Sequence, residues 1–480
     1  MMTAMFADSE RARGSDGEMG DMTHPSGDSA VGSDSTVSVE SVVRAFVYGF
    51  APVFNLSQVE RFVTTGVGAN SAAPFNSFSH APGLAGPDEE FVSINNDTIY
   101  SMAQLDLSVG PLILDVPDTA DAYFVLQFVD AWTNNFAYIG KRATGTDAGR
   151  YVLVPPGWPG ELPADITSVH CSTRIVSIVG RWACDGPDDV DRVRKLQDQI
   201  SLTPLVANDP EGLPEPDPAV PEELMFWERL RLYLQAFPPA PQDVALQQAF
   251  APLGLLESGP SPYANADPAL AAVLVEGAAQ GQGRIEEVLK SGAGDGIVNG
   301  WHRAFHIFDY NDDFFEIGTI DSAEWRIQDR AKAIGLRAAA AMGGLWGNHG
   351  YEAAYSQIYT DSAGDQLTGE HTYTITFAPT PPVDAFWSIT MYSMPHFYLV
   401  SNPIGRYSIG DRTRGLVYDD DGSLTLTLSA TEPSDPTARA NWLPSPTGPF
   451  RPLLRMYIPH ETVLDGSYEM PPVVRVDPRS

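Results

Sequence analysis

The chain has 480 residues and carries 62 acidic against 29 basic side chains, a formal net charge of −33. A surface this acidic repels phosphate backbones and anionic lipid headgroups, which argues against nucleic acid or a membrane as a partner. The length suits two or three domains, and a hydrophobic content of 43% is enough for a substantial core.

Residues 1–36 are rich in Ser, Gly, Asp and Met and contain no apolar run. This composition predicts a disordered acidic tail and differs from a signal peptide, which begins with basic residues followed by an apolar segment. No stretch of about 18 consecutive apolar residues follows, so no transmembrane helix is expected. By default, we expect a cytoplasmic location.

Residues 37–186 are predicted to form the N-terminal domain. Apolar residues recur with a spacing close to 3.6 over 37–64, which predicts one or two amphipathic helices. Short apolar runs separated by Gly, Pro and Asp then indicate strands, and their spacing favours a β-sandwich or barrel. The predicted strands are 111–116, 122–129, 136–139, 151–154 and 173–179.

Residues 187–350 read as a helical connecting region, because the apolar spacing becomes helical again. Several of these segments begin with proline or acidic residues, which are favoured in the first turn of a helix. The predicted helices are 188–200, 221–237, 241–250, 268–289 and 331–345.

Residues 351–480 return to a β pattern, with polar and apolar residues alternating in 371–377 and 424–428. The turn at 420–423 is typical of a hairpin. Further strands are expected at 386–392, 416–418 and 453–458. The C-terminal domain is therefore predicted to be a jelly-roll-type β-sandwich, and the whole chain to be mainly β with a helical middle segment, an α+β fold.

Cys171 and Cys184 are the two cysteines, thirteen residues apart on expected neighbouring strands. They could form a disulfide or remain two buried thiols. A single pair is neither a disulfide framework nor a metal-ligand pattern, so buried thiols are favoured.

Several ordered motifs resemble the proteins that pair domains of unknown function 1254 and 1214. The first domain's pattern appears at Asn95–Ser101 and Asp130–Asn134, and the second's at Phe386–Tyr392 and Asn441–Pro444. Ile94 stands where the family usually has proline. The resemblance implies β-rich domains ending in a jelly roll, a homo-oligomer and no assigned activity.

The polar cluster before the first strands is the main candidate site. A carboxylate beside a histidine can fix the tautomer of the ring and let it act as a general base, so Asp97 and His80 are the predicted catalytic pair. Asn95, Asn96 and Tyr100 would contact the substrate. The alternative is structural, because Asn and Asp before a strand commonly form turns through side-chain-to-backbone hydrogen bonds.

Asp130, Trp132 and Asn134 follow another strand, and an aromatic ring beside carboxylate and amide groups can hold a sugar or polyol. A buried tryptophan with a capping aspartate is the alternative. Arg406 is a candidate partner for a substrate carboxylate, with structural ion pairing as the alternative.

His302 and His306 are spaced i, i+4, which would place both on one helix face and suggests a transition-metal site. The spacing alone is weak, so no metal ligand is assigned and a partly exposed helix face is favoured.

Motifs for a serine nucleophile elbow, a phosphate-binding loop, dinucleotide binding and a zinc protease are absent from the sequence. The leading hypothesis is therefore a cofactor-independent acid–base enzyme, a hydrolase or lyase, acting on a polar small molecule or glycoside. The alternative is a non-catalytic carbohydrate-binding, ligand-binding or assembly protein. A metal-dependent enzyme using the two histidines is third.

Overall fold

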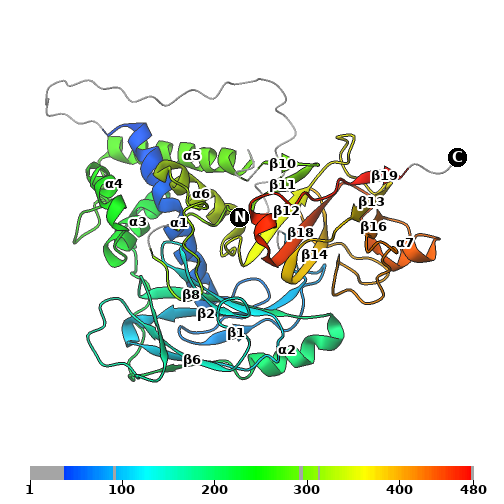
Figure 1. Ribbon diagram of the computed structural model, residues 1–480. Helices are drawn as coiled ribbons and strands as arrows, with labels where there is room; N and C mark the ends of the chain where they lie inside the picture. The colour runs from blue at the N-terminus through cyan, green and yellow to red at the C-terminus, as the bar shows by residue number, and fades with distance from the viewer. Residues whose placement is uncertain (1–36, 90–92, 291–293, 295, 312–313, 477–480) are drawn as a thin grey trace.

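The computed structural model describes residues 37–89, 93–290, 294, 296–311 and 314–476, and the predicted tail at 1–36 lies outside them. Figure 1 shows helices at the upper left, the sheets of the first half below them and the sheets of the C-terminal part at the right. This arrangement brings the two β regions side by side.

Two sheets form the first β region, one of five strands in the order β1-β2-β8-β4-β5 and one of four in the order β7-β6-β3-β9. Apolar side chains from both sheets, among them Leu105, Phe128 and Leu153, form one buried cluster. The strands are β1 (Phe78–His80), β2 (Thr98–Asp106), β3 (Leu112–Val116), β4 (Phe124–Asp130), β5 (Asn135–Gly140), β6 (Gly149–Val154), β7 (Thr167–His170), β8 (Ile175–Ala183) and β9 (Ser201–Pro204).

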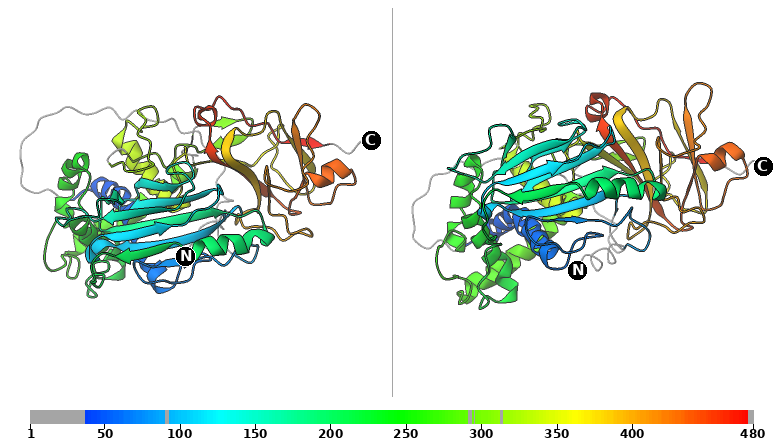
Figure 2. Two further views of the ribbon diagram at one scale, coloured as in Figure 1. Left: turned by 60° about the horizontal axis from the view of Figure 1, so that its bottom comes forward. Right: turned by 90° about the horizontal axis from the view of Figure 1, so that it is seen from below.

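Helices cover the outer face of the five-stranded sheet. The first helix packs against three others, α3, α5 and α6, through a shared apolar core. Gly277 and Gly281 permit this contact, because a Cβ at either position would lie within 2.6 Å of Val42 or Phe46. The helices of this half are α1 (Val39–Thr64), α2 (Val190–Gln197), α3 (Met225–Ala236), α4 (Val244–Gln248), α5 (Pro268–Lys290) and α6 (Arg330–Gly344). Figure 2 shows α2 beside the strands, away from the other helices.

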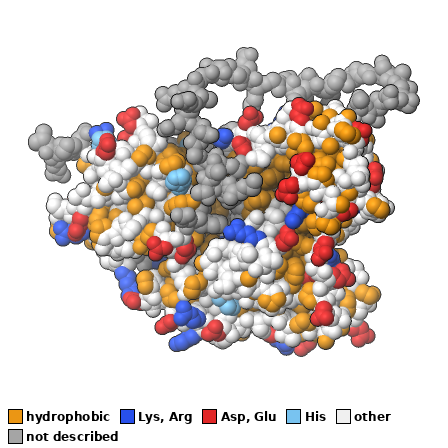
Figure 3. Space-filling model, turned by 180° about the vertical axis from the view of Figure 1, so that it is seen from behind, with side chains coloured by type: hydrophobic (Ala, Val, Ile, Leu, Met, Phe, Trp, Pro, Cys, Tyr) orange, Lys and Arg blue, Asp and Glu red, His pale blue; other side chains and the backbone are white. Residues whose placement is uncertain are grey.

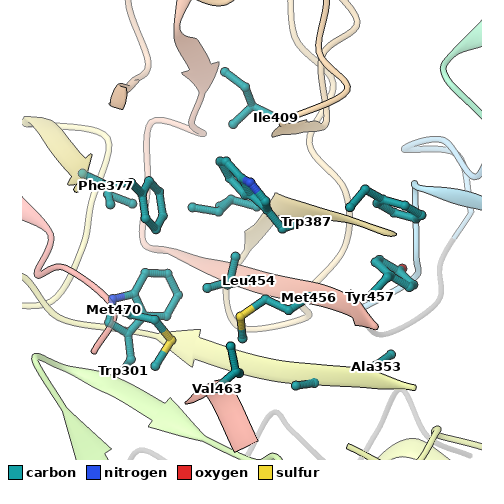
Figure 4. Close-up of a cluster of buried hydrophobic side chains, with 14 of the residues drawn as sticks. Trp301, Ala353, Phe377, Trp387, Ile409, Leu454, Met456, Tyr457, Val463 and Met470 are labelled. Atoms are coloured by element: carbon teal, nitrogen blue, oxygen red, sulfur yellow. The ribbon is translucent and has the colours of Figure 1, made fainter. Parts of the chain in front are cut away.

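The C-terminal region contains a six-stranded sheet, β10-β11-β12-β18-β14-β15, and a four-stranded sheet, β17-β16-β13-β19. Trp387, Leu454 and Met456 lie in the apolar cluster of this region (Figure 4). The elements are β10 (Ile297–Val298), β11 (Trp301–Arg303), β12 (Ala353–Ile358), β13 (Thr372–Phe377), β14 (Val383–Ser393), β15 (Ser408–Gly410), β16 (Leu424–Ser429), α7 (Pro436–Ala440), β17 (Trp442–Pro444), β18 (Phe450–Pro459), α8 (Glu461–Leu464) and β19 (Val474–Val476).

The mixed α+β class is confirmed: the described residues form four sheets and eight α-helices, with no closed barrel among them. The sandwich and jelly-roll shapes are not confirmed and stay predictions. Cys171 and Cys184 are both buried free thiols, as favoured. Within the described part of the chain, every helix is too short or too polar to cross a membrane.

Two local predictions are wrong. Residues 416–418 form no strand, because this segment is irregular and is held at Val417 by the side chain of Asn441. His302 lies in strand β11 and His306 in the turn after it, so the two histidines do not share a helix face. Residues 297–298 and 301–303 pair as a short hairpin, and this pairing overrides the i, i+4 spacing.

Candidate functional site

The two β regions meet at a cluster of buried polar side chains, which we call the seam: Asn95, Asp97, Ser388, Arg455 and Tyr457. The Asp97 side chain is 3% exposed, and its Oδ2 accepts hydrogen bonds from Ser388 Oγ at 2.6 Å and from Tyr457 OH at 3.2 Å. Asn95 Nδ2 lies 3.0 Å from the same tyrosine oxygen. The motif after residue 93 therefore contacts strands β14 and β18 of the other β region.

The residues before β2 also form the turn that sequence reasoning offered as the structural alternative. Asn95 Oδ1 accepts a hydrogen bond from the backbone N–H of Asp97 at 2.6 Å, and its Nδ2 donates to Thr98 Oγ1 at 2.8 Å. Such an Asx turn fixes the backbone so that the Asp97 side chain points at the other β region. Asn95 thus serves both the turn and the seam.

Two arginines of the C-terminal region donate across the seam to the backbone of the first β region. Arg455 Nη2 donates to the carbonyl of Ser93 at 2.8 Å, and Arg412 Nη2 donates to the carbonyl of Asp97 at 3.1 Å. The guanidinium of Arg412 lies 3.5 Å from the centroid of the Phe386 ring, a cation–π contact. The seam therefore joins the two regions by backbone as well as side-chain contacts.

His80 lies in β1 and contacts a different group. Its Nδ1 is 2.7 Å from Ser101 Oγ, which also accepts from Trp182 Nε1 at 2.8 Å and Gln197 Nε2 at 3.0 Å. Burial lowers the pKa of His80, and Asp198 opposes this shift. Because the contacts of Asp97 go to Ser388 and Tyr457, the structure does not bring the predicted catalytic pair into direct contact.

The other residues of the predicted cluster have separate partners. Asn96 donates to the carbonyl of Ala85 at 2.6 Å, and the half-buried ring of Tyr100 lies 5.4 Å from the guanidinium of Arg181. Arg406 donates to the carbonyls of Ala440 and Trp442 at 3.1 and 2.8 Å. Arg406 therefore fixes the backbone before β17.

A cavity of about 410 Å³ opens between the first β region and the helices, and we call it the proline-walled pocket. Its polar and charged lining includes three groups of the first β region and three of the helical region: Asp130, Asn134, His170, Asp243, Arg330 and Arg337. Five prolines form much of the remaining wall: Pro155, Pro156, Pro238, Pro239 and Pro241. Ligand pockets in proteins are typically about 300–1,000 Å³, so the volume suits a small molecule.

Asp130 organises one side of the pocket. Its Oδ1 accepts from the backbone N–H groups of Trp132 and Asn134 at 2.9 and 2.8 Å. Its Oδ2 accepts from Asn134 Nδ2 at 2.9 Å and Ser172 Oγ at 2.8 Å. Burial raises the pKa of Asp130 above its ordinary value, although these hydrogen bonds oppose the shift.

Two arginines from α6 complete the pocket. Arg337 Nη1 donates to the carbonyl of Trp132 at 2.8 Å, and its Nη2 donates to Asn134 Oδ1 at 2.9 Å. Arg330 forms a two-contact ion pair with Asp243, at 2.9 and 2.6 Å. The amide of Asn134 therefore links the Asp130 carboxylate to the Arg337 guanidinium.

Trp132 lines the pocket but offers no open ring face. It is 7% exposed, and its Nε1 lies 3.3 and 3.2 Å from the carbonyls of Phe237 and Pro238. The ring therefore packs in the core and its N–H is hydrogen-bonded. This matches the alternative of a buried tryptophan with a capping aspartate.

The two histidines with the i, i+4 spacing, to which no metal was assigned, are separated by their contacts. His306 Nδ1 lies 2.6 Å from Asp309 Oδ2 and its Nε2 lies 3.0 Å from the carbonyl of Leu464, while His302 packs edge-on against Tyr359. Within the described ranges, no group of three or more His, Cys, Asp or Glu side chains is arranged to hold a metal ion.

The sequence did not reveal several residues that complete the seam and the proline-walled pocket. Ser388 and Tyr457 lie in apolar strands, where a lone hydroxyl gives no signal. Arg451 and Arg455, spaced by four on β18, are the signal that was available, because an even spacing places both on one sheet face. His170, Asp243, Arg330 and Arg337 reach the pocket from segments far apart in the sequence, which no local pattern reveals.

The chain matches two family models and is similar to proteins of solved structure. The family model described as a protein of unknown function, DUF1254, matches residues 75–204, and the one described as DUF1214 matches residues 352–461. The crystal structure of the VPA0106 protein from Vibrio parahaemolyticus is similar in fold, with 23% identity and a TM-score of 0.68 over 92% of this chain and 100% of that chain. A crystal structure of an uncharacterized protein from Burkholderia cenocepacia gives 12% identity and a TM-score of 0.42 over 92% of this chain and 93% of that one.

No protein with a curated description matches the chain. The two domain matches contain the motifs that form the seam, Asn95–Ser101 in the first and Phe386–Tyr392 in the second. The chain therefore belongs to the proteins that pair a domain of unknown function 1254 with a domain of unknown function 1214.

Proposed function

We propose that the chain binds a small, neutral polar molecule, such as a sugar or polyol, in the proline-walled pocket. The observation that carries this proposal is an open cavity of about 410 Å³ lined by both charged groups and prolines. Rigid apolar walls with a few fixed polar groups are the usual composition of a small-molecule site.

The charges of the lining favour a neutral ligand. Asp243 is paired with Arg330, and the opposite charges of Asp130 and Arg337 are linked through Asn134. With two carboxylates and two guanidiniums in these contacts, the described lining has no large excess of either sign. Hydroxyl groups can both donate to carboxylates and accept from guanidiniums, so a polyol matches this mixture.

A second candidate is an acid–base enzyme acting in the same pocket. It is favoured by the raised pKa of Asp130, which burial causes, because a carboxyl group with a raised pKa is suited to general acid catalysis. The enzyme with Asp97 and His80 as its acid–base pair has less support, since these side chains contact different partners. Hydrolase or lyase activity stays a prediction.

The binding proposal is tested by a thermal-shift screen of monosaccharides and polyols, followed by calorimetric titration of any compound that stabilises the protein. His170→Ala and Arg330→Gln change the lining, while His396→Ala and Arg150→Gln change exposed residues elsewhere. We expect the affinity to fall about tenfold or more in the two pocket variants and to stay unchanged in the controls. Stabilisation that persists equally in all four variants, or none in the wild type, would overturn the proposal.

A further inference from the structure

One face of the six-stranded sheet is unusually polar where it meets the first β region. On β18, Arg455 pairs in register with Ser388 of β14 and Tyr355 of β12, and Arg451 pairs with Tyr392. Residues opposite one another in a sheet share a face, so these side chains lie on one surface, with Leu453 between the two arginines. Leu454 and Met456, which alternate with them, lie in the apolar core.

The two arginines on this surface are buried and bind neutral groups. Arg455 is 4% exposed and donates to Thr390 Oγ1 at 2.8 Å and Tyr392 OH at 2.9 Å, besides its bond to the carbonyl of Ser93. Arg451 is 5% exposed and donates to Gln357 Oε1 at 2.9 Å and to the hydroxyl of Ser93. The Nε of Arg451 is buried without a hydrogen-bond partner.

A third buried guanidinium belongs to the first β region. Arg181 of β8 donates to Gln127 Oε1 at 2.8 Å, Asn348 Oδ1 at 3.2 Å and the carbonyl of Trp346 at 2.7 Å. Tyr355 interacts electrostatically with both Arg181 and Arg455, so it lies between the two regions' arginines. All three arginines therefore bind neutral acceptors.

In the part of the chain that the structure describes, two of the three arginines have no carboxylate partner. Among the described residues, Glu352 is engaged by Arg142 at 2.6 Å, and Asp97 interacts electrostatically with Arg455. Arg181 and Arg451 form no ion pair within the described chain. Burial of a charge without a counter-charge is unfavourable, and burial lowers the pKa of Arg451 accordingly.

Side chains of β12 on the same face are partly accessible to solvent. Tyr355, opposite Arg455, and Gln357, opposite Leu453, are half-buried, whereas Ser356 and Ile358 are buried. This part of the face therefore has some contact with solvent near Arg455.

We propose that a small dianion, a phosphate or a dicarboxylate, binds between the two β regions at Arg181, Arg451 and Arg455, with Tyr355 at its entrance. A dianion supplies negative charge to the two arginines that form no ion pair, and its oxygens accept from guanidinium groups in the geometry that arginine favours. This site is separate from the proline-walled pocket and does not depend on the function proposed for it.

The test is a thermal-shift titration with phosphate, sulfate and succinate, each compared with chloride at equal ionic strength. Arg451→Met and Tyr355→Phe alter the site, and the second removes a single hydroxyl so that the fold is retained. Arg150→Met is the matched control, because Arg150 is exposed and pairs with Asp115. Isothermal titration of the best anion then gives affinities for each variant.

We expect at least one dianion to raise the melting temperature of the wild type and of Arg150→Met above the chloride value. The affinity should fall about 10- to 100-fold in Arg451→Met, as expected for lost hydrogen bonds to a charged group, and by a smaller factor in Tyr355→Phe. Phosphate alone, or succinate alone, identifies which class of dianion fits. Equal responses to dianion and chloride, or equal responses in all variants, would overturn the proposal.

Discussion

The seam and the proline-walled pocket both contain a buried aspartate, but the two aspartates differ in their hydrogen-bond partners and surroundings. The Asp97 carboxylate accepts hydrogen bonds from two hydroxyl groups of the other β region, and these bonds hold two parts of the chain together. The Asp130 carboxylate accepts hydrogen bonds from its own loop and from Ser172, and an open cavity lies beside it. The difference shows that a dense polar motif can mark an interface, whereas the pocket combines polar groups with an open cavity.

The largest effect on stability is expected when the seam carboxylate is removed, and this variant tests whether the seam is structural. We expect Asp97→Ala to lower the free energy of unfolding by roughly 3–4 kcal/mol, because two buried hydroxyls lose their acceptor and Arg455 loses a nearby negative charge. Asp115→Ala, at a position 37% exposed, should change it by about 0.5 kcal/mol or less. Urea unfolding measures both, and a similar small change in the two variants would show that the seam is not structural.

Acid should weaken a second buried contact, at His349. Its Nδ1 lies 2.7 Å from Tyr351 OH, and burial lowers the pKa of the ring to about 4. Because the folded protein resists protonation more than the unfolded chain, this contribution to stability is present above about pH 6.5 and is lost as the pH falls towards 4. The loss should be roughly 3 kcal/mol.

Unfolding of the wild type and His349→Gln between pH 7.5 and 4.5 measures this effect. The variant should show a shallower decline, because it lacks the titrating ring. Parallel declines in the two proteins would assign the acid sensitivity to other groups.

The next largest loss of stability is expected within the pocket, at the Asn134 amide that links Asp130 to Arg337. Asn134→Ala removes a donor to the carboxylate and an acceptor from the guanidinium, and we expect a loss of about 2 kcal/mol. Asn208→Ala, at an exposed position, is the matched control and should change little. A neutral result for Asn134→Ala would indicate that water replaces the amide.

The smallest effect on stability is expected at the rim. His170 is exposed, so His170→Ala should change the free energy of unfolding by less than about 0.5 kcal/mol while it weakens binding of the ligand. Chemical unfolding and calorimetric titration of the same preparation separate the two effects. A large loss of stability with unchanged affinity would remove His170 from the site.

The sequence predicted the elements well where local patterns are strong. The helices at 37–64 and 268–289 and the strands at 424–428 and 453–458 were found, because apolar spacing and alternation report directly on the buried face. Strand β12 was missed, since Ala353 and Ala354 give little β signal and pairing with β18 determines its structure.

The candidate site was predicted less completely. Asp97 and Asp130 were recognised as candidate site residues beside strands, but their surroundings depend on contacts between residues more than 40 positions apart. Surface charge was easier to predict, as acidic side chains are spread over the face shown in Figure 3. The homo-oligomer, the cytoplasmic location and the domain limits stay predictions.

The most direct test compares ligand stabilisation in two variants, Asp97→Asn at the seam and Arg330→Gln in the pocket. A sugar or polyol that raises the melting temperature of the wild type is added to each at a saturating concentration. Our account predicts that Asp97→Asn melts lower than the wild type but gains the same increment from the ligand, whereas Arg330→Gln gains little. Loss of the increment in Asp97→Asn with a full increment in Arg330→Gln would contradict the account and return the binding site to the seam.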